Sequence, residues 1–179
     1  LLARLLTAAP SKAVLSDTAN LAGDEATIFG AVINDLATAA RTADPDAVDT
    51  EFHDLFIGVG RGELIPYASY YLTGFLHERP LAKLRGDMAA FGLKRADDIN
   101  EPEDNVASIL EIMAGLIDGG LGINSNHDRE RAFFEAHVAS WIPHFFADLS
   151  SAQNARLYAN VGRAGAAFLA IEEDAFRMA

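Results

Sequence analysis

Polar side chains that could hold a cation gather near the middle of the chain, in the run Glu101-Pro102-Glu103-Asp104-Asn105. Three of these side chains are carboxylates and one is an amide. Capping a helix needs one or two polar side chains, so the surplus suggests Coulomb attraction to a multiply charged cationic ligand. The partial positive charge of a helix N-terminus opposes such binding, and carboxylates also stabilise that end of a helix on their own. The pattern alone leaves both interpretations open.

The same run starts a segment with helical periodicity, Asn100–Asp118. Asn100 is predicted to be the N-cap, Pro102 suits the first turn, and Glu103 stands where a capping box places its carboxylate. One apolar stripe follows at helical spacing: Val106, Ile109, Leu110, Met113, Leu116 and Ile117. The segment therefore predicts a helix that is buried along one face and ends at Gly119.

Helical periodicity also governs most of the remaining chain. The segments with this period include residues 13–22, 25–41, 45–56 and 80–91. Toward the C-terminus one helix is predicted to end near Pro143, and Ser150 or Ser151 is predicted to cap the last helix. Alternating β-branched runs are absent from the sequence, so no Asn-Gly or Asp-Gly hairpin between such runs is found. The sequence thus predicts an all-α fold, a compact helical bundle of seven to nine helices.

Domain organisation follows from length and from one polar connector. A chain of 179 residues is long enough to bury a core without disulfides or metals, so residues 1–179 are predicted to form a single domain. The segment 94–99 is polar and interrupts the helical pattern. We therefore expect two subdomains joined by a hinge near residues 94–105.

Tyrosines gather just before this region. A glycine-rich loop, residues 58–66, is followed by an aromatic run that is predicted to lie in a loop as well: Tyr67, Tyr70, Tyr71 and Phe75. The glycines lack the preceding strand and the following Lys-Ser/Thr of a phosphate loop, which favours a simple turn. Exposed tyrosines beside acidic residues suit an apolar, basic peptide.

Composition narrows the classes of partner. Asp and Glu number 26 against 14 Lys and Arg, giving a net charge of −12. This balance disfavours nucleic acids and anionic membranes and favours a basic partner. The absence of cysteine excludes disulfides, thiolate zinc sites and cysteine nucleophiles, and it is typical of a cytoplasmic protein. The apolar start Leu1–Leu6 is interpreted as a helix whose beginning has been cut off, rather than as a signal peptide.

Catalytic and metal-binding patterns are weak. The five histidines include no pair at i, i+4 spacing, and no nucleophile elbow surrounds a serine. An enzyme alternative remains, namely an all-α metal-dependent hydrolase with ligands drawn from His53, Asp54, His127 and Asp128. A helical adaptor protein is a further alternative. The sequence itself favours neither a cofactor nor a metal.

Three stretches resemble a known family. Phe52–Gly58 is similar to a Leu-Phe-x-Gly segment, Pro66–Leu72 to a Pro/aromatic-Ser-x-Tyr segment, and Glu101–Asn105 to a Glu-Pro-x-Asp-His motif. These segments belong to the TorD/DmsD/NarJ group of cytoplasmic chaperones, which help molybdenum- and tungsten-containing redox enzymes to mature. The resemblance covers nearly the whole chain. The run Arg61–Phe75 looks most similar to the branch associated with formate dehydrogenases.

The resemblance implies an all-helical fold, no catalysis, no cofactor and a cytoplasmic location. It implies binding of the apo-form or the twin-arginine leader peptide of a redox enzyme, by a monomer or a domain-swapped dimer. The expected polar contacts are Glu101, Asp104 and Asn105, and the apolar side is expected to be lined by Tyr67, Ser69 and Tyr70. Pro102 is expected to hold the hinge geometry. The family's motif histidine is Asn105 here, and an amide cannot become cationic.

Overall fold

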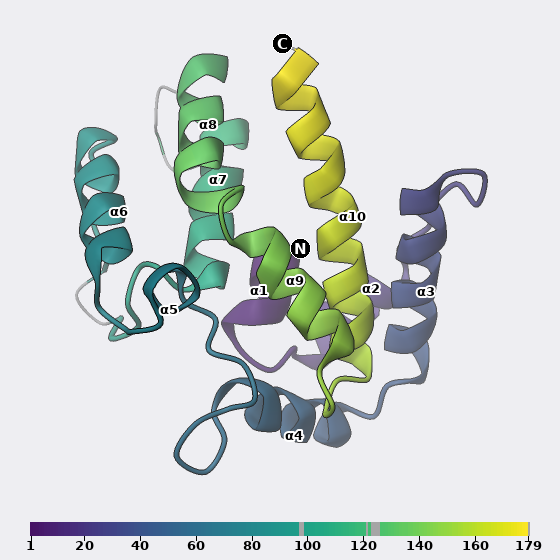
Figure 1. Ribbon diagram of the computed structural model, residues 1–179. Coiled ribbons are helices and arrows are strands. Elements are labelled where there is room, and N and C mark those ends of the chain that lie inside the picture. The colour runs from purple at the N-terminus through teal and green to yellow at the C-terminus, as the bar shows by residue number, and fades with distance from the viewer. Residues whose placement is uncertain (97–98, 121, 123–125, 179) are drawn as a thin grey trace. The chain divides into compact units, whose positions relative to one another are not determined.

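The computed structural model describes residues 1–96, 99–120, 122 and 126–178, and these residues form ten α-helices and one short π-helical segment (Figure 1). Their only β-pairing is an isolated antiparallel bridge between Tyr67 and Asn105. The all-α prediction is confirmed, although the helices outnumber the seven to nine expected. None of the helices in the described ranges is long and apolar enough to cross a membrane.

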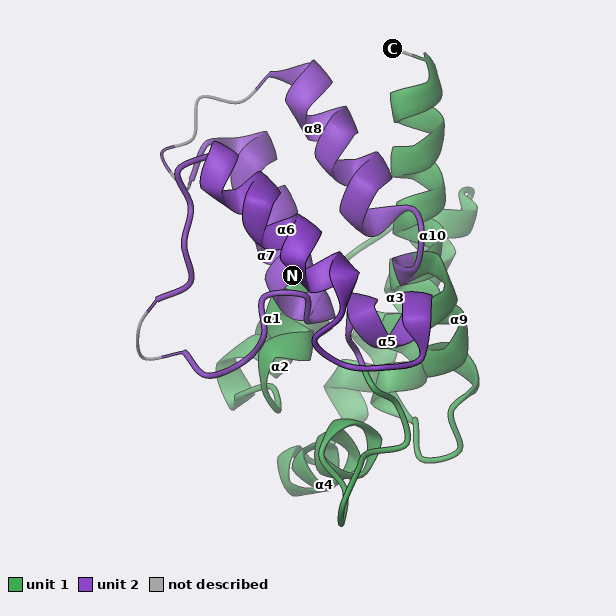
Figure 2. Cartoon of the chain, turned by 60° about the vertical axis from the view of Figure 1, so that its left-hand side comes forward, with its two compact units in different colours: residues 1–65, 143–179 green, residues 66–142 purple. Residues whose placement is uncertain are grey.

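The chain divides into two compact units (Figure 2). Unit 1 contains residues 1–65 and 143–179, and unit 2 contains residues 66–142. The chain thus leaves unit 1 after residue 65 and returns to it at residue 143. The segment 94–105, predicted as a hinge, lies inside unit 2, and its residues 97 and 98 are outside the described ranges. The hinge stays a prediction.

Unit 1 is built from helices at both ends of the chain: α1 (Leu2–Thr7), α2 (Lys12–Ala19), α3 (Ile28–Thr42), α4 (Pro45–Phe56), α9 (Ile142–Ser151) and α10 (Leu157–Met178). Helix α3 packs against both α2 and α10, and α10 also contacts α1 and α4. The predicted cap of α4 is confirmed, because the Asp44 carboxylate accepts a hydrogen bond from the Asp46 N–H and Pro45 follows at the first helical position.

The last helix starts later than predicted. Ser150 and Ser151 end α9, and their hydroxyls donate back to the Ala147 carbonyl at 2.7 and 3.0 Å. Helix α10 is capped instead by the buried Glu51, which accepts hydrogen bonds from three successive backbone N–H groups, those of residues 156–158. A cap drawn from a position about a hundred residues away leaves no local sequence signal. Pro143 also lies in the first turn of α9, where its missing N–H costs little.

Unit 2 contains α5 (Ala68–Thr73), α6 (Arg79–Ala90), α7 (Val106–Asp118), α8 (His127–Phe133) and the π-helical segment η1 (Phe134–Val138). Helix α5 packs on α6, and α7 packs on α8 and η1. The apolar stripe predicted for α7 is mostly buried, with Ile109 and Leu116 almost inaccessible and Ile117 exposed. Gly119 ends α7 with φ of 70°, as its glycine predicts.

Two predictions about unit 2 are wrong. Helix α7 begins at Val106 with Asn105 as its N-cap, so residues 100–104 precede the helix instead of forming its first turn. Tyr70 and Tyr71, which were expected in a loop, lie in the short helix α5 with Tyr67 as its N-cap, whereas Phe75 follows the helix. The two errors share a cause, because the backbone and carboxylate that were assigned to the start of α7 form hydrogen bonds with the start of α5.

Candidate functional site

Residues 101–105 and residues 66–69 form one structural feature of unit 2, which we call the junction. The Ala68 N–H donates to the Asp104 carbonyl at 2.9 Å, and the Val106 N–H donates to the Pro66 carbonyl at 2.9 Å. These bonds flank the Tyr67–Asn105 bridge. The loop before α7 is therefore held against the start of α5 by backbone pairing, which brings together two segments that the sequence separates by more than thirty residues.

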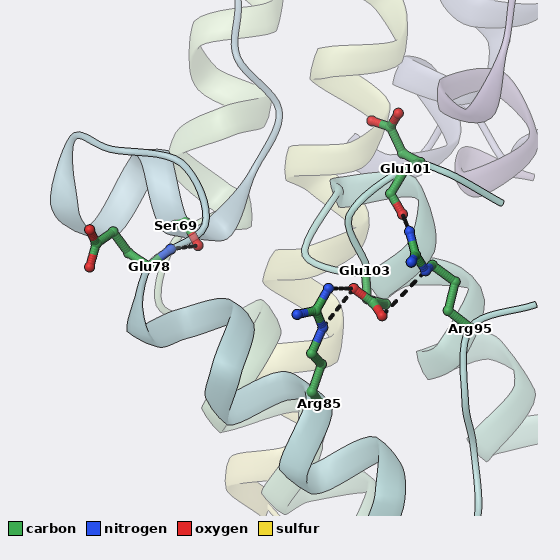
Figure 3. A network of polar contacts seen from close by, with 6 residues as sticks. All are labelled: Ser69, Glu78, Arg85, Arg95, Glu101 and Glu103. Carbon is green, nitrogen blue, oxygen red and sulfur yellow. Dashed lines mark hydrogen bonds and ion pairs between the residues drawn. The ribbon is translucent and has the colours of Figure 1, made fainter. Parts of the chain in front are cut away.

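Asp104 completes the junction from inside. Its carboxylate accepts a hydrogen bond from the Ser69 N–H at 2.9 Å, and its side chain is 1% exposed. It thus caps α5 in the manner of an N-cap residue, although it belongs to another segment. Ser69 is fully buried, and its hydroxyl accepts a hydrogen bond from the Glu78 N–H at 3.2 Å at the start of α6 (Figure 3). Asp104 and Ser69 therefore position α5 and α6 from below the surface.

Glu101 is the exposed carboxylate of the junction. One of its oxygens, Oε1, accepts hydrogen bonds from the Tyr67 hydroxyl and from the Asn105 amide, the latter at 3.0 Å. Asn105 in turn accepts from the Ala107 N–H at 2.9 Å, so one amide both caps α7 and orients Glu101. Burial and the hydrogen bond to Glu101 raise the pKa of Tyr67 above its usual value, so the phenol remains a donor at neutral pH.

Glu103 serves a different purpose from the predicted capping box. Arg85 of α6 donates to it from Nε at 3.0 Å and from Nη2 at 2.8 Å, and Arg95 Nε lies 3.5 Å away (Figure 3). Arg95 also donates to the Glu101 carbonyl at 3.3 Å. Two guanidinium groups therefore tie α6 and the connector before the junction to one nearly buried carboxylate. The capping-box assignment of Glu103 to the backbone of Asn100 is wrong.

Replacing Glu103 by glutamine should reduce stability in a pH-dependent way. Burial opposes ionisation of Glu103, but the Arg85 hydrogen bonds, a backbone hydrogen bond and the charges of Arg85 and Arg95 together outweigh it and hold the pKa of Glu103 below its usual value. A lowered folded-state pKa contributes stability above the unfolded-state pKa of about 4.3, and this contribution is lost as pH falls through the folded-state value. Because Arg85 is half-exposed, the loss in Glu103→Gln at neutral pH should be about 1 kcal/mol or less.

Urea unfolding of both proteins across acidic and neutral pH checks this expectation. The difference in free energy of unfolding should shrink below about pH 4. A difference that stays constant from neutral to strongly acidic pH would show that the charge of Glu103 contributes nothing.

The accessible part of the predicted site is smaller than expected. Tyr67, Tyr70 and Pro102 are half-buried and Glu101 is exposed, whereas Asp104, Asn105 and Ser69 are buried. The junction therefore presents the Glu101 carboxylate beside the Tyr67 ring, and Tyr70 follows three residues later on α5. Such a surface can receive a cationic group and pack apolar atoms beside it. Exposed apolar side chains continue beyond α5, at Leu72, Phe75 and Leu76.

The part of the chain that the structure describes contains no metal cluster of the kind that the enzyme alternative requires. Among the described residues, no group of three or more His, Cys, Asp or Glu side chains could hold a metal ion. His53 Nδ1 lies 3.8 Å from its exposed neighbour Asp54, and His127 begins α8. His53 and Asp54 belong to unit 1, whereas His127 and Asp128 belong to unit 2.

Comparisons with known proteins agree with the resemblance seen in the sequence. The profile of the nitrate reductase delta subunit family matches residues 23–147. A chaperone protein TorD from Vibrio cholerae serotype O1 is 30% identical over 126 residues, covering 66% of this chain and 57% of the relative. A chaperone protein TorD from Vibrio vulnificus is 31% identical over 103 residues, covering 53% of this chain and 48% of that relative. The chain thus spans about half the length of the curated relatives it matches.

A solved structure shares the fold. The crystal structure of a chain from Archaeoglobus fulgidus, described as a redox enzyme maturation protein, superimposes with a TM-score of 0.64 and covers 94% of this chain and 90% of its own. The two sequences are 20% identical, so this similarity concerns the fold alone.

Proposed function

This chain belongs to the nitrate reductase delta subunit family, the TorD/NarJ group, and we propose that it is a maturation chaperone for a molybdenum- or tungsten-containing redox enzyme. In this role it binds the apo-enzyme, its twin-arginine leader peptide or both during cofactor insertion and before export. It acts in the cytoplasm as a binding protein and catalyses no reaction. The run Arg61–Phe75 favours a formate dehydrogenase as the client.

The observation that carries the proposal is the exposed Glu101 carboxylate, which accepts a hydrogen bond from Tyr67, with the half-buried Tyr70 three residues further on in α5. A leader arginine can donate two parallel hydrogen bonds to a carboxylate, and both hydrogen bonds that the Glu101 carboxylate accepts within the described residues go to Oε1. The Oε2 atom is thus available to a ligand. The apolar part of the leader would pack on the two phenol rings. Asp104, Asn105 and Ser69 then contribute by positioning this surface, and Pro102 by shaping the turn that carries Glu101.

The geometry is compatible with specific recognition of a leader arginine, beyond general attraction of positive charge. Charge alone would attract any basic chain to a protein of net charge −12. A planar carboxylate held by Tyr67 and Asn105 favours the planar guanidinium of arginine over the ammonium group of lysine. The protein acts as a monomer or as a domain-swapped dimer, and either form carries the junction.

Leader binding should weaken with salt but persist in part. A peptide with an Arg-Arg pair followed by an apolar core is titrated calorimetrically into the protein at about 0.1 M and about 1 M salt, which shortens the Debye length from about 10 Å to about 3 Å. Affinity should fall several-fold, because the long-range attraction is screened, while packing on Tyr67 and Tyr70 is retained.

The control is the same peptide with a Lys-Lys pair. If the Lys-Lys peptide bound as tightly as the Arg-Arg peptide at both salt concentrations, the protein would be a helical adaptor without leader specificity. If salt left the affinity of the Arg-Arg peptide unchanged, charge would play no part in its binding.

A further inference from the structure

A groove in unit 2 lies between α6 and the segment formed by α8 and η1. It consists of two adjoining pockets of about 290 and 300 Å³, and both are lined by Lys83 of α6 and Ala136 of η1. Each pocket has the volume of a small ligand or of one to two large side chains. Among the described residues of the junction, Ala68 lines one of the pockets and residues 101–105 line neither.

The π-helical segment shapes the floor of the groove. The Ala139 N–H donates to the Phe134 carbonyl at 2.9 Å, five residues back, which marks the π-turn. His137 on this segment is 5% exposed, its Nε2 lies 2.6 Å from an Asp87 oxygen, and its carbonyl accepts from the Trp141 indole at 2.8 Å. Single π-turns are uncommon and occur frequently at functional sites.

The walls of both pockets are largely apolar. Leu72, Pro80 and Trp141 line one pocket, and Phe91 and Phe133 line the other, with ring centroids 6.2 Å apart. Leu72 is 46% exposed at the mouth of its pocket. These surfaces suit the apolar side chains of a bound segment, one in each pocket.

The charge of the groove is opposite to that of the chain. Its described lining residues include the cations Arg79, Lys83 and Arg129 and the single carboxylate Asp87, in a protein with 26 acids and 14 bases. Lys83 and Asp87 form an ion pair at 2.7 Å and His137 also contacts Asp87, so the net positive charge of the lining comes from Arg79 and Arg129. Arg129 lies over the Phe91 ring at 5.7 Å, so this cation also borders the apolar wall. A basic leader would be repelled here, whereas an acidic ligand would be attracted.

We propose that this groove is a second client-binding site, which takes an acidic segment of the client protein that carries apolar anchor residues. The inference rests on the proposed chaperone function, because it assigns the occupant to the client. Apolar anchors fill the two pockets and glutamate or aspartate residues between them face Arg79, Lys83 and Arg129. The chaperone then holds its client at two chemically opposite sites, a basic leader at the junction and an acidic segment at the groove.

A probe peptide tests the groove directly. In this Glu peptide, leucines at i, i+3 and i+7 alternate with glutamates. A second peptide, the Lys peptide, carries lysines in place of the glutamates. Fluorescence anisotropy measures the binding of each labelled peptide to the full chain. The Glu peptide should bind, and the Lys peptide should bind more weakly. Arg79→Glu should weaken binding of the Glu peptide about tenfold, since an attraction becomes a repulsion. The preference of the protein for the Glu peptide over the Lys peptide should therefore become smaller or reverse.

Lys94→Glu is the matched control, because Lys94 is an exposed cation of unit 2 outside the groove lining. Lys94→Glu should change the affinities for the Glu peptide and the Lys peptide by no more than about twofold, the scale of a surface charge change. Arg79→Glu should also leave the affinity for an Arg-Arg leader peptide unreduced, so failure of this inference and failure of the leader proposal give different results.

Three outcomes would overturn the inference. The first is a Glu peptide that fails to bind the wild-type protein, and the second is equal weakening of the Glu peptide by Arg79→Glu and Lys94→Glu. The third is a concentration-dependent dimer that Arg79→Glu dissociates, which would assign the groove to a second copy of the chain. Circular dichroism spectra of both variants that match the wild type ensure that binding, and not folding, is measured.

Discussion

Replacing Asp104 by alanine is expected to lower the free energy of unfolding by about 2 kcal/mol. The carboxylate is 1% exposed and accepts the hydrogen bond of the buried Ser69 N–H. Its removal leaves that donor unpaired, which costs about 1–3 kcal/mol, and removes the cap of α5. Urea denaturation followed by circular dichroism measures the loss. Leader affinity should fall as well, because Tyr67 and Tyr70 are no longer held in place.

Asp104→Asn is the control, because the amide oxygen can still accept from the Ser69 N–H. It should cost less than about 1 kcal/mol and leave most of the leader affinity intact. Asp44→Ala removes an exposed helix cap and should cost about 1 kcal/mol. An Asp104→Ala variant no less stable than Asp44→Ala would contradict the structural role assigned to Asp104.

Helices with local signals were predictable from the sequence. The Asp44-Pro45 start of α4, the apolar stripe of α7 and its Gly119 stop all follow from neighbouring residues. The start of α7 was not predictable from the sequence, because Asn100 and Asn105 are both good cap residues and local preference does not distinguish them. The choice of Asn105 depends on the pairing of residues 101–104 with α5 and α6.

The candidate site was predictable in its residue types but only partly in their roles. Glu101 and Tyr67 were expected to be accessible, and they meet each other at the junction. Asp104 and Ser69 were expected as contacts, yet both are buried, because tertiary hydrogen bonds recruit them. Arg85 and Arg95 were missed altogether, since eighteen and eight residues separate them from Glu103 and no helical spacing links the partners.

Glu101→Gln is expected to weaken binding of an Arg-Arg leader by about ten- to a hundredfold, the scale of a charged hydrogen bond. The substitution preserves shape, because the amide oxygen can still accept from Tyr67 and Asn105, so folding should be nearly unchanged. A Lys-Lys leader should lose much less, because an ammonium group cannot make the planar two-point contact. A larger loss of affinity for the Arg-Arg leader than for the Lys-Lys leader therefore distinguishes a specific contact with Glu101 from general attraction by the acidic surface.

Glu78→Gln is the matched control, because Glu78 is also an exposed glutamate of unit 2 and its side chain forms no cap hydrogen bond (Figure 3). The decisive measurement is calorimetric titration of the Arg-Arg leader into wild type, Glu101→Gln and Glu78→Gln at one salt concentration. Glu101→Gln is expected to lose at least about tenfold in affinity and Glu78→Gln less than about twofold. Equal losses in the two variants would contradict leader recognition at the junction.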